Sequence, residues 1–325
     1  RMTKKQRELM RRGIHFYEEL ARQNGVDPTT WPTYLSLLRA SSLENAYELG
    51  EAGRNDEAKK AYQEALAHAE QMQANFDPGS QEQIDARGAL VGCLNDYATF
   101  LLKRGELKTA ATQLLNARKI LEELRRQTSD ETKYATSLGQ NHYNMGVVCT
   151  KAGRHGDAEY SYSQALPLLE LTVRTDPEKL VWRQMLAMCQ YNLGHLLYVY
   201  NNADRYEEAR IHLEKSLGEW QRLASSDPFV SEYHSRVGAT LNNLGVLATE
   251  RGDLTLARKL FEEALVNQKR SVAQQPIFEL THQFMGQHYR ELTAVLDKLG
   301  DAEALAAVQK EQTQWQSSVN SNPAN

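Results

Sequence analysis

The sequence has few cysteines that could form disulfide bonds and few prolines that would interrupt helices. It contains eight prolines and three cysteines in 325 residues, which leaves room for long helices and provides no disulfide framework. No apolar run approaches the ~18 residues that span a bilayer, and the polar start does not resemble a signal peptide. The net charge of −4 lacks the basic excess typical of proteins that bind nucleic acid. We therefore expect neither membrane nor nucleic acid as a partner.

The few residues that could carry redox or metal chemistry are scattered. We expect Cys93, Cys149 and Cys189 to be free thiols that fill small spaces between helices, which predicts a reducing, cytoplasmic setting. Among the nine histidines, His282 and His288 lie six residues apart, the wrong spacing for two metal ligands on one helix face. We predict no metal and no cofactor.

Signatures of catalysis are also missing. The sequence contains no H-E-x-x-H, C-x-x-C, phosphate-binding loop or G-x-S-x-G motif. Its many carboxylates, and the basic residues near the N-terminus, have the pattern of solvated helix faces. We therefore predict that this chain is not an enzyme. Because it starts with Arg1, we interpret it as a fragment of a longer protein.

What the sequence has in abundance is repetition. One stretch places small residues and an aromatic at Gly146, Gly153, Ala158, Tyr162 and Ala165. The same intervals return at Gly245, Gly252, Ala257, Phe261 and Ala264. Small residues at fixed helical offsets indicate two helices packed closely back to back, with the signature glycine where they meet. This is the helix-turn-helix pattern of tetratricopeptide repeats.

The repeat is longer than usual. The equivalent residues Ala58, Ala110, Ala158, Ala209 and Ala257 lie 52, 48, 51 and 48 residues apart, against about 34 in the common tetratricopeptide unit. We attribute the surplus to helices of about 20–24 residues, with a longer turn at 200–204. The residues Pro28, Pro177, Pro228 and Pro276 recur at one repeat position and start new helices.

The predicted fold is all-α: a right-handed superhelical solenoid of tetratricopeptide-like helix pairs with repeats of about 48–52 residues. Residues 1–28 are expected to form an N-terminal helix that is half a repeat. Residues 29–318 are expected to hold five full repeats and a degenerate capping repeat, followed by a polar tail at 319–325.

Two segments, Leu186–Gly194 (LAMCQYNLG) and Ala239–Gly245 (ATLNNLG), resemble the C-terminal arrays of planctomycete-type bacterial serine/threonine protein kinases. The resemblance covers about residues 14–300. No kinase motif occurs in this sequence, so the resemblance implies a kinase domain upstream. It further implies that the array is the regulatory or recruiting arm of a bacterial signalling protein.

A polar residue recurs two positions before the signature glycine. It is Asn144, Asn192 and Asn243 in three repeats, Asp96 in an earlier one and Glu44 in the first. In tetratricopeptide arrays the first helix of each pair lines an inner groove, as the resemblance implies, and an amide there can bond both the N–H and the C=O of a peptide. Alternatively, each asparagine bonds the adjacent helix. The sequence leaves both open.

Counting helical turns from these positions predicts the rest of the groove. Lys103 and Lys151 could bind an acidic residue or a chain-end carboxylate, or they could be a solvated rim. We predict a scaffold that binds a protein or peptide; the alternative is a structural spacer or a self-associating module without a groove ligand. The candidate groove residues are Asn95, Asp96, Lys103, Tyr143, Asn144, Lys151, Tyr191, Asn192, His195, Asn242 and Asn243.

Overall fold

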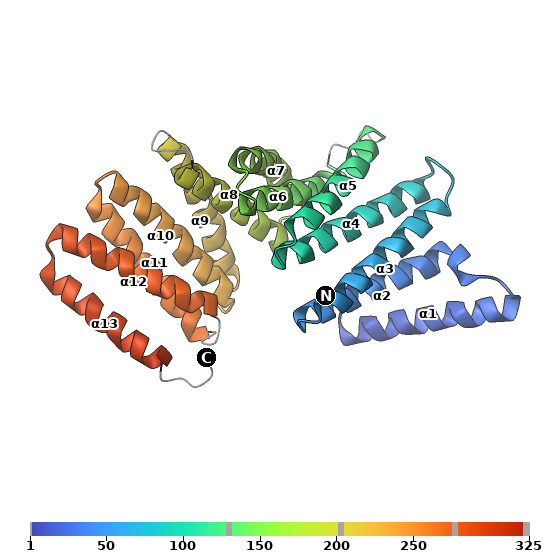
Figure 1. The fold of residues 1–325 in the computed structure, drawn as a ribbon, viewed down its shortest axis with the longest axis horizontal. Coiled ribbons are helices and arrows are strands. Elements are labelled where there is room, and N and C mark those ends of the chain that lie inside the picture. Colours follow the sequence, from blue (N-terminus) through green and yellow to red (C-terminus); the bar gives the residue numbers. More distant parts are fainter. Residues whose placement is uncertain (1, 128–131, 201–204, 275–278, 321–325) are drawn as a thin grey trace. The chain divides into compact units, whose positions relative to one another are not determined.

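The computed structural model describes residues 2–127, 132–200, 205–274 and 279–320, and within these ranges it contains thirteen α-helices and one short 3₁₀ helix (Figure 1). No strand occurs in these ranges. The all-α prediction is confirmed. Residues 201–204 of the predicted long turn, and Pro276, lie outside the described residues.

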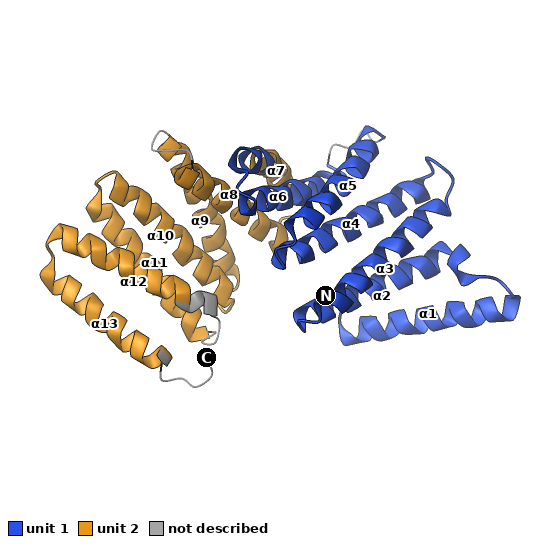
Figure 2. Ribbon diagram, viewed as in Figure 1, with its two compact units in different colours: residues 1–161 blue, residues 162–325 orange. Residues whose placement is uncertain are grey.

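The chain divides into two compact units, residues 1–161 (unit 1) and 162–325 (unit 2), and the boundary falls within one helix (Figure 2). Unit 1 holds α1 (Lys4–Asn24), the 3₁₀ helix η1 (Pro28–Thr30), α2 (Pro32–Glu51), α3 (Asn55–Ala74), α4 (Gln81–Lys103), α5 (Leu107–Arg126), α6 (Ala135–Lys151) and the start of α7 (His155–Thr175). Unit 2 holds the rest of α7, α8 (Leu180–Tyr200), α9 (Tyr206–Ser226), α10 (Ser231–Glu250), α11 (Leu254–Gln274), α12 (Glu279–Leu299) and α13 (Ala302–Asn320).

Helix packing follows the repeat within each unit. From α1 to α6, and from α8 to α13, every helix packs against the next along the chain. Alternate helices also touch, as α4 touches α6 and α10 touches α12. We call the even-numbered helices from α2 to α12 the A helices, and the odd-numbered helices from α3 to α13 the B helices. This pairing is the tetratricopeptide-like arrangement that the sequence predicts.

The turns inside five of the helix pairs are built the same way. After α2, Gly53 has a φ of 74°, and the N–H of Arg54 donates to the carbonyl of Leu49 at 2.9 Å. A glycine in this left-handed conformation ends a helix without the steric cost of a Cβ. The glycine and the five-residue hydrogen bond recur at Gly105, Gly153, Gly252 and Gly300.

Small residues hold the two helices of a pair close together. The repeat alanines Ala58, Ala110, Ala209 and Ala257 are fully buried. A Cβ added at Gly245 would lie 2.6 Å from the Phe261 ring, which is closer than atoms can pack. At Gly194 it would lie 2.9 Å from Leu213, so both glycines sit where the helices meet, as predicted.

The ends of the array differ slightly from the predicted boundaries. Asp27 caps a 3₁₀ turn through a 2.9 Å bond from the N–H of Thr29, and α2 itself begins only at Pro32. At the other end, α13 runs to Asn320 and so includes the first two residues of the predicted tail. Val319 and Trp315, one turn before it, line the same hollow.

The three thiols are buried, as predicted. Burial raises the pKa of each thiol, because a thiolate loses its hydration there. Among the described helices, none has both the length and the apolar character needed to cross a bilayer.

Candidate functional site

Asparagine recurs two positions before the signature glycine at Asn144, Asn192 and Asn243, which we call the asparagine ladder. The three side chains lie in different environments. Asn144 is buried, and its Nδ2 donates to Oγ1 of Thr99 on the preceding A helix at 3.0 Å. Asn192 is half-buried, with its Nδ2 3.4 Å from the hydroxyl of Tyr162. Asn243 is half-buried too, and its Nδ2 has no partner among the described residues. Asn144 therefore bonds a neighbouring helix, whereas the side chains of Asn192 and Asn243 are partly exposed.

Asn95 belongs to a buried polar network rather than to a surface. Its Oδ1 accepts from Nδ2 of Asn141 at 3.1 Å, and Asn141 also donates to the carbonyl of Leu114 at 2.9 Å. Nε of Arg118 donates to Oδ1 of Asn141 at 3.1 Å. These bonds join α4, α5 and α6 and satisfy polar groups that burial would otherwise leave unpaired.

Asn242 makes a similar buried link in unit 2. Its Oδ1 lies 2.9 Å from Nδ1 of His288 on α12, and because the amide oxygen only accepts, Nδ1 carries the proton. Burial lowers the pKa of His288 to about 4. Asn95 and Asn242 are both almost fully buried, so we leave them out of the surface that a partner could contact.

The remaining candidates divide between the units. In unit 2, the rings of Tyr191 and His195 stack with centroids 6.1 Å apart, and burial lowers the pKa of His195, so this imidazole is neutral at pH 7. Burial raises the pKa of Tyr191, an effect opposed by the nearby side chain of Asn243 and the charge of Arg236. In unit 1, Tyr143 is buried, whereas Lys103 and Lys151 are exposed.

A hollow of about 620 Å³ opens on the A helices α2 and α4 of unit 1. Two of the predicted groove residues, Asp96 and Lys103, line it. Most of the other lining residues are not among the predicted groove residues. That prediction starts from the repeated asparagines, and α2 has Glu44 instead of asparagine at this repeat position. The charged lining residues are Arg39, Glu44, Glu51, Asp96, Lys103 and Arg104, and the aromatic ones are Tyr47, Tyr62 and Phe100.

Asp96 is the most perturbed carboxyl in the hollow. Its side chain reaches water through the mouth of the hollow, yet protein encloses its other sides, and this desolvation raises its pKa to about 6. The charge of Arg39 opposes the shift without forming an ion pair in the described part of the chain. Nε of Arg39 is itself buried without a hydrogen-bond partner among those residues.

Aromatic rings form one wall beside Asp96. The Tyr62 ring lies 5.2 Å from Phe100 and stacks at 5.2 Å on Tyr97. Burial, followed by the nearby charge of Asp96, raises the pKa of Tyr62 to about 12. The guanidinium of Arg104 lies 5.6 Å from the centre of the Phe100 ring and donates to the carbonyl of Gly50 at 2.7 Å.

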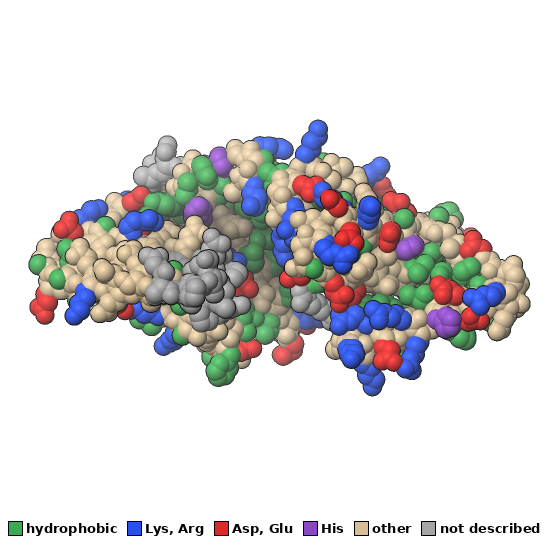
Figure 3. Space-filling view, turned by 60° about the horizontal axis from the view of Figure 1, so that its bottom comes forward, with side chains coloured by type: hydrophobic (Ala, Val, Ile, Leu, Met, Phe, Trp, Pro, Cys, Tyr) green, Lys and Arg blue, Asp and Glu red, His purple; other side chains and the backbone are tan. Residues whose placement is uncertain are grey.

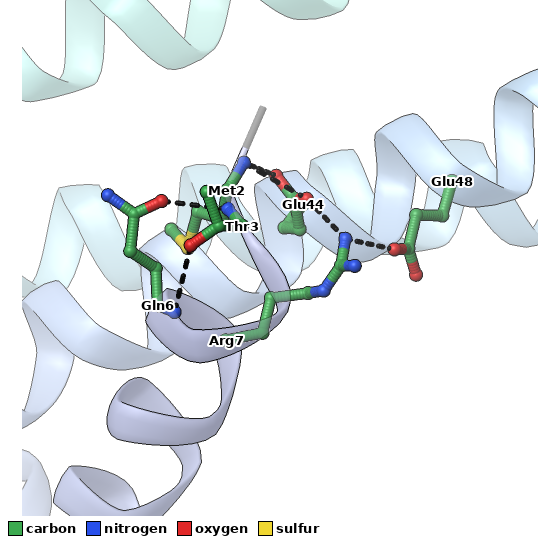
Figure 4. A network of polar contacts seen from close by, with 6 residues as sticks. All are labelled: Met2, Thr3, Gln6, Arg7, Glu44 and Glu48. Atoms are coloured by element: carbon green, nitrogen blue, oxygen red, sulfur yellow. Dashed lines mark hydrogen bonds and ion pairs between the residues drawn. The ribbon is translucent and has the colours of Figure 1, made fainter.

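The carboxylate of Glu44 is already occupied by the start of the chain, as Figure 4 shows. The main-chain N–H of Met2 donates to its two oxygens at 3.3 and 3.4 Å. Nη1 of Arg7 donates to Glu44 at 3.0 Å and to Glu48 at 2.7 Å. The side chain of Glu44 is only 11% exposed.

The basic residues near the N-terminus gather over the first half of α1 (Figure 3). Lys4, Lys5, Arg11 and Arg12 are exposed, and Arg12 pairs with Glu8 one turn earlier. This is the solvated helix face that the sequence predicts. No group of three or more His, Cys, Asp or Glu side chains within the described ranges could hold a metal ion.

Comparison with known proteins gives the fold. No protein family matches the sequence, and no curated protein matches it either. The crystal structure of BtubC (BKLC) from P. vanneervenii matches with a TM-score of 0.56 at 21% identity, over 82% of this chain and 92% of that one. The apo form of RapI matches with a TM-score of 0.51 at 14% identity, over 84% and 75%. A Rap protein complexed with competence and sporulation factor matches at 0.44 and 18%, over 84% and 74%. BtubC and RapI are tetratricopeptide-like helical repeat proteins, and this chain has the same fold.

Proposed function

We propose that this chain is a scaffold that binds a protein or peptide on the faces of its A helices. The hollow in unit 1 is the observation that carries the proposal. About 620 Å³ is within the size range of ligand sites in proteins. Its walls combine rings with charged groups, whereas a purely structural solenoid has no need to place charges in a recess, where their desolvation is costly.

The A helices of unit 2 support the same proposal with different chemistry. Asn192 and Asn243 are half-buried, and the rings of Tyr191 and His195 stack on the same helix as Asn192. An amide can bond the N–H and the C=O of a peptide, and aromatic rings supply contact area at low entropic cost. Tyr143, Asn144 and Lys151 of unit 1 remain secondary candidates, since Asn144 already bonds Thr99.

Selection of random peptides tests the proposal. A phage-displayed library is panned on the immobilised chain and on two tryptophan variants. Ala40→Trp fills the hollow, which Ala40 lines, whereas Ala67→Trp makes the same change at an exposed position on α3. We expect peptides that bind the parent and Ala67→Trp and lose affinity for Ala40→Trp, with all three proteins melting alike.

The rival function is a spacer or a self-associating module. It predicts that no peptide family is enriched, and for self-association that the molar mass from light scattering rises above 36.9 kDa with concentration. Enrichment of peptides by a chain that stays monomeric would remove the rival.

We also propose that the array recruits partners to a larger bacterial signalling protein, with a serine/threonine kinase domain upstream, in the cytoplasm. The motifs in Leu186–Gly194 and Ala239–Gly245 support the kinase connection, and the three free thiols support a reducing compartment. Reading the coding sequence before Arg1 tests this. Kinase motifs there would support the proposal, and an upstream region of another kind would contradict it.

A further inference from the structure

Glu44 and Asp96 occupy the same position in consecutive repeats, two residues before Ala46 and Ala98 respectively. Both line the hollow of unit 1. Because the two positions are equivalent, the groups that contact the carboxylate of Glu44 indicate which kind of group the carboxylate of Asp96 binds.

The first of these carboxylates holds a peptide segment of the chain itself. Glu44 accepts from a main-chain N–H, that of Met2, and from a cationic side chain, that of Arg7 (Figure 4). Such charge-assisted bonds are shorter and stronger than neutral ones. The segment approaches the A-helix face of α2, so Met2 also lines the hollow.

The second carboxylate lacks such a partner. In the described residues no hydrogen bond or ion pair reaches the side chain of Asp96, and only the more distant charge of Arg39 acts on it. The Tyr62 and Phe100 rings stand beside it in the same hollow. The negative faces of such rings attract a guanidinium or ammonium group, as the position of Arg104 over Phe100 illustrates.

From this equivalence we infer that Asp96 and the hollow around it receive the arginine or lysine side chain of a partner protein, as Glu44 receives Arg7 of α1. The inference rests on the proposed scaffold function and adds the chemistry of the partner.

The other charges of the hollow are compatible with a cation. On α2, Glu44 pairs with Arg7, Arg39 lines the hollow with its Nε buried, and Glu51 adds negative charge. On α4, Arg104 is held by the carbonyl of Gly50, and Lys103 lies seven residues from Asp96, two helical turns or roughly 10 Å away. The phenol of Tyr62 is neutral at pH 7, because burial raises its pKa to about 12. The opposite reading, an anion bound between Lys103 and Arg39, would place its charge beside Asp96 and Glu51.

The composition of the selected peptides is the first test. Panning of a phage-displayed random 12-residue library should enrich peptides that share one arginine or lysine. A synthetic copy of the strongest binder should bind Asp96→Asn about tenfold to a hundredfold more weakly, the range for a hydrogen bond to a charged group. Asp85→Asn, on the same helix but exposed and away from the hollow, is the matched control and should bind like the parent. Replacing the shared arginine by citrulline, which has the same shape without the charge, should weaken binding of the parent but not of Asp96→Asn.

Proton competition provides a second readout. Because Asp96 must be ionised to hold a cation and has a pKa near 6 in the free chain, the affinity of that peptide should fall as the pH drops from 7.5 to 5. Asp96→Asn should remove most of this dependence. An unchanged slope in the variant would contradict the role of Asp96.

The outcomes separate this inference from the function on which it rests. If no peptide family is enriched, the scaffold proposal fails and this one with it. If peptides are enriched without a basic residue, or bind Asp96→Asn as well as the parent, the scaffold proposal stands and the inference is overturned. Acidic peptides that Lys103→Met weakens would overturn it in favour of an anion, whereas a cation should bind Lys103→Met as well as the parent or better.

Discussion

The two units solve the same packing problem with different residues. Where the two helices of a repeat meet, unit 2 has Gly194 and Gly245, while the first two repeats of unit 1 have Ala46 and Ala98, which are fully buried. In unit 2 the Phe261 ring lies directly against Gly245. In the first repeat of unit 1 the equivalent Tyr62 stacks on Tyr97 and lies against Phe100 of the next A helix, which leaves room for the methyl group of Ala46. In these two repeats, therefore, the direction in which the aromatic side chain leans accounts for the difference between glycine and alanine.

The units also differ two residues earlier in the repeat. Unit 1 begins with the carboxylates Glu44 and Asp96, whereas unit 2 has the amides Asn192 and Asn243. A carboxylate only accepts hydrogen bonds and titrates, while an amide donates as well and does not titrate. We therefore propose that this repeat position serves a cation in the first two repeats and peptide backbone in unit 2, so changes of residue or pH should affect the units differently.

The largest loss of stability is expected from placing a side chain at Gly245 of unit 2, where the two helices of the repeat meet. Gly245→Leu places a side chain where even a Cβ would overlap Phe261, so it should cost more than the ~1–3 kcal/mol of ordinary overpacking. Urea unfolding followed by circular dichroism measures this. Gly92→Leu is the control in unit 1, because nothing lies within 4 Å of its Cβ. Equal midpoints for the two variants would show that the repeat register is wrong.

Acid should destabilise unit 2 through His288. The pKa of His288 falls from 6.5 to about 4 on burial, so the folded state resists protonation. The stabilisation of the folded state that is linked to neutral His288 is complete above pH 6.5. It is lost as the pH falls towards 4, by up to about 3 kcal/mol of unfolding free energy. His288→Gln cannot take up a proton, and its unfolding midpoint should depend less steeply on pH over this window. A slope identical to that of the parent would contradict the assignment.

Removing ladder asparagines should separate the two roles that sequence leaves open. Asn144→Ala loses a buried bond to Thr99 and should cost about 1–3 kcal/mol of unfolding free energy. Asn192→Ala should cost less, because its contact with Tyr162 is long, at 3.4 Å, and the side chain is half-exposed. Thermal melts rank the two. If both are neutral in stability and both abolish peptide binding, the amides act as ligand contacts throughout.

The smallest effect should be a gain in stability. The folded chain raises the pKa of Asp96 from 3.8 to about 6, so the fold favours the protonated form and ionised Asp96 opposes folding. The penalty is complete above about pH 6 and disappears as the pH falls to 4. Asp96→Asn should therefore melt slightly higher than the parent at pH 7.5 and at the same temperature at pH 4. A lower melting temperature for the variant at pH 7.5 would mean that Asp96 has a stabilising partner.

Sequence alone determined the repeat, because the repeat depends on residue types at fixed positions along the chain. A glycine at each turn and small residues at fixed helical offsets impose the helix pairs wherever they fold, so Gly53, Gly105 and Gly252 marked real turns. Tertiary structure alone decided the site. Asn95 and Asn242 carry the same amide as Asn243, but each bonds a group about 46 residues away, and no local pattern encodes such a partner. Asp96 matters for the same reason: desolvation raises its pKa against the opposing charge of Arg39, and only packing brings Arg39 and Tyr62, from other helices, into the same hollow.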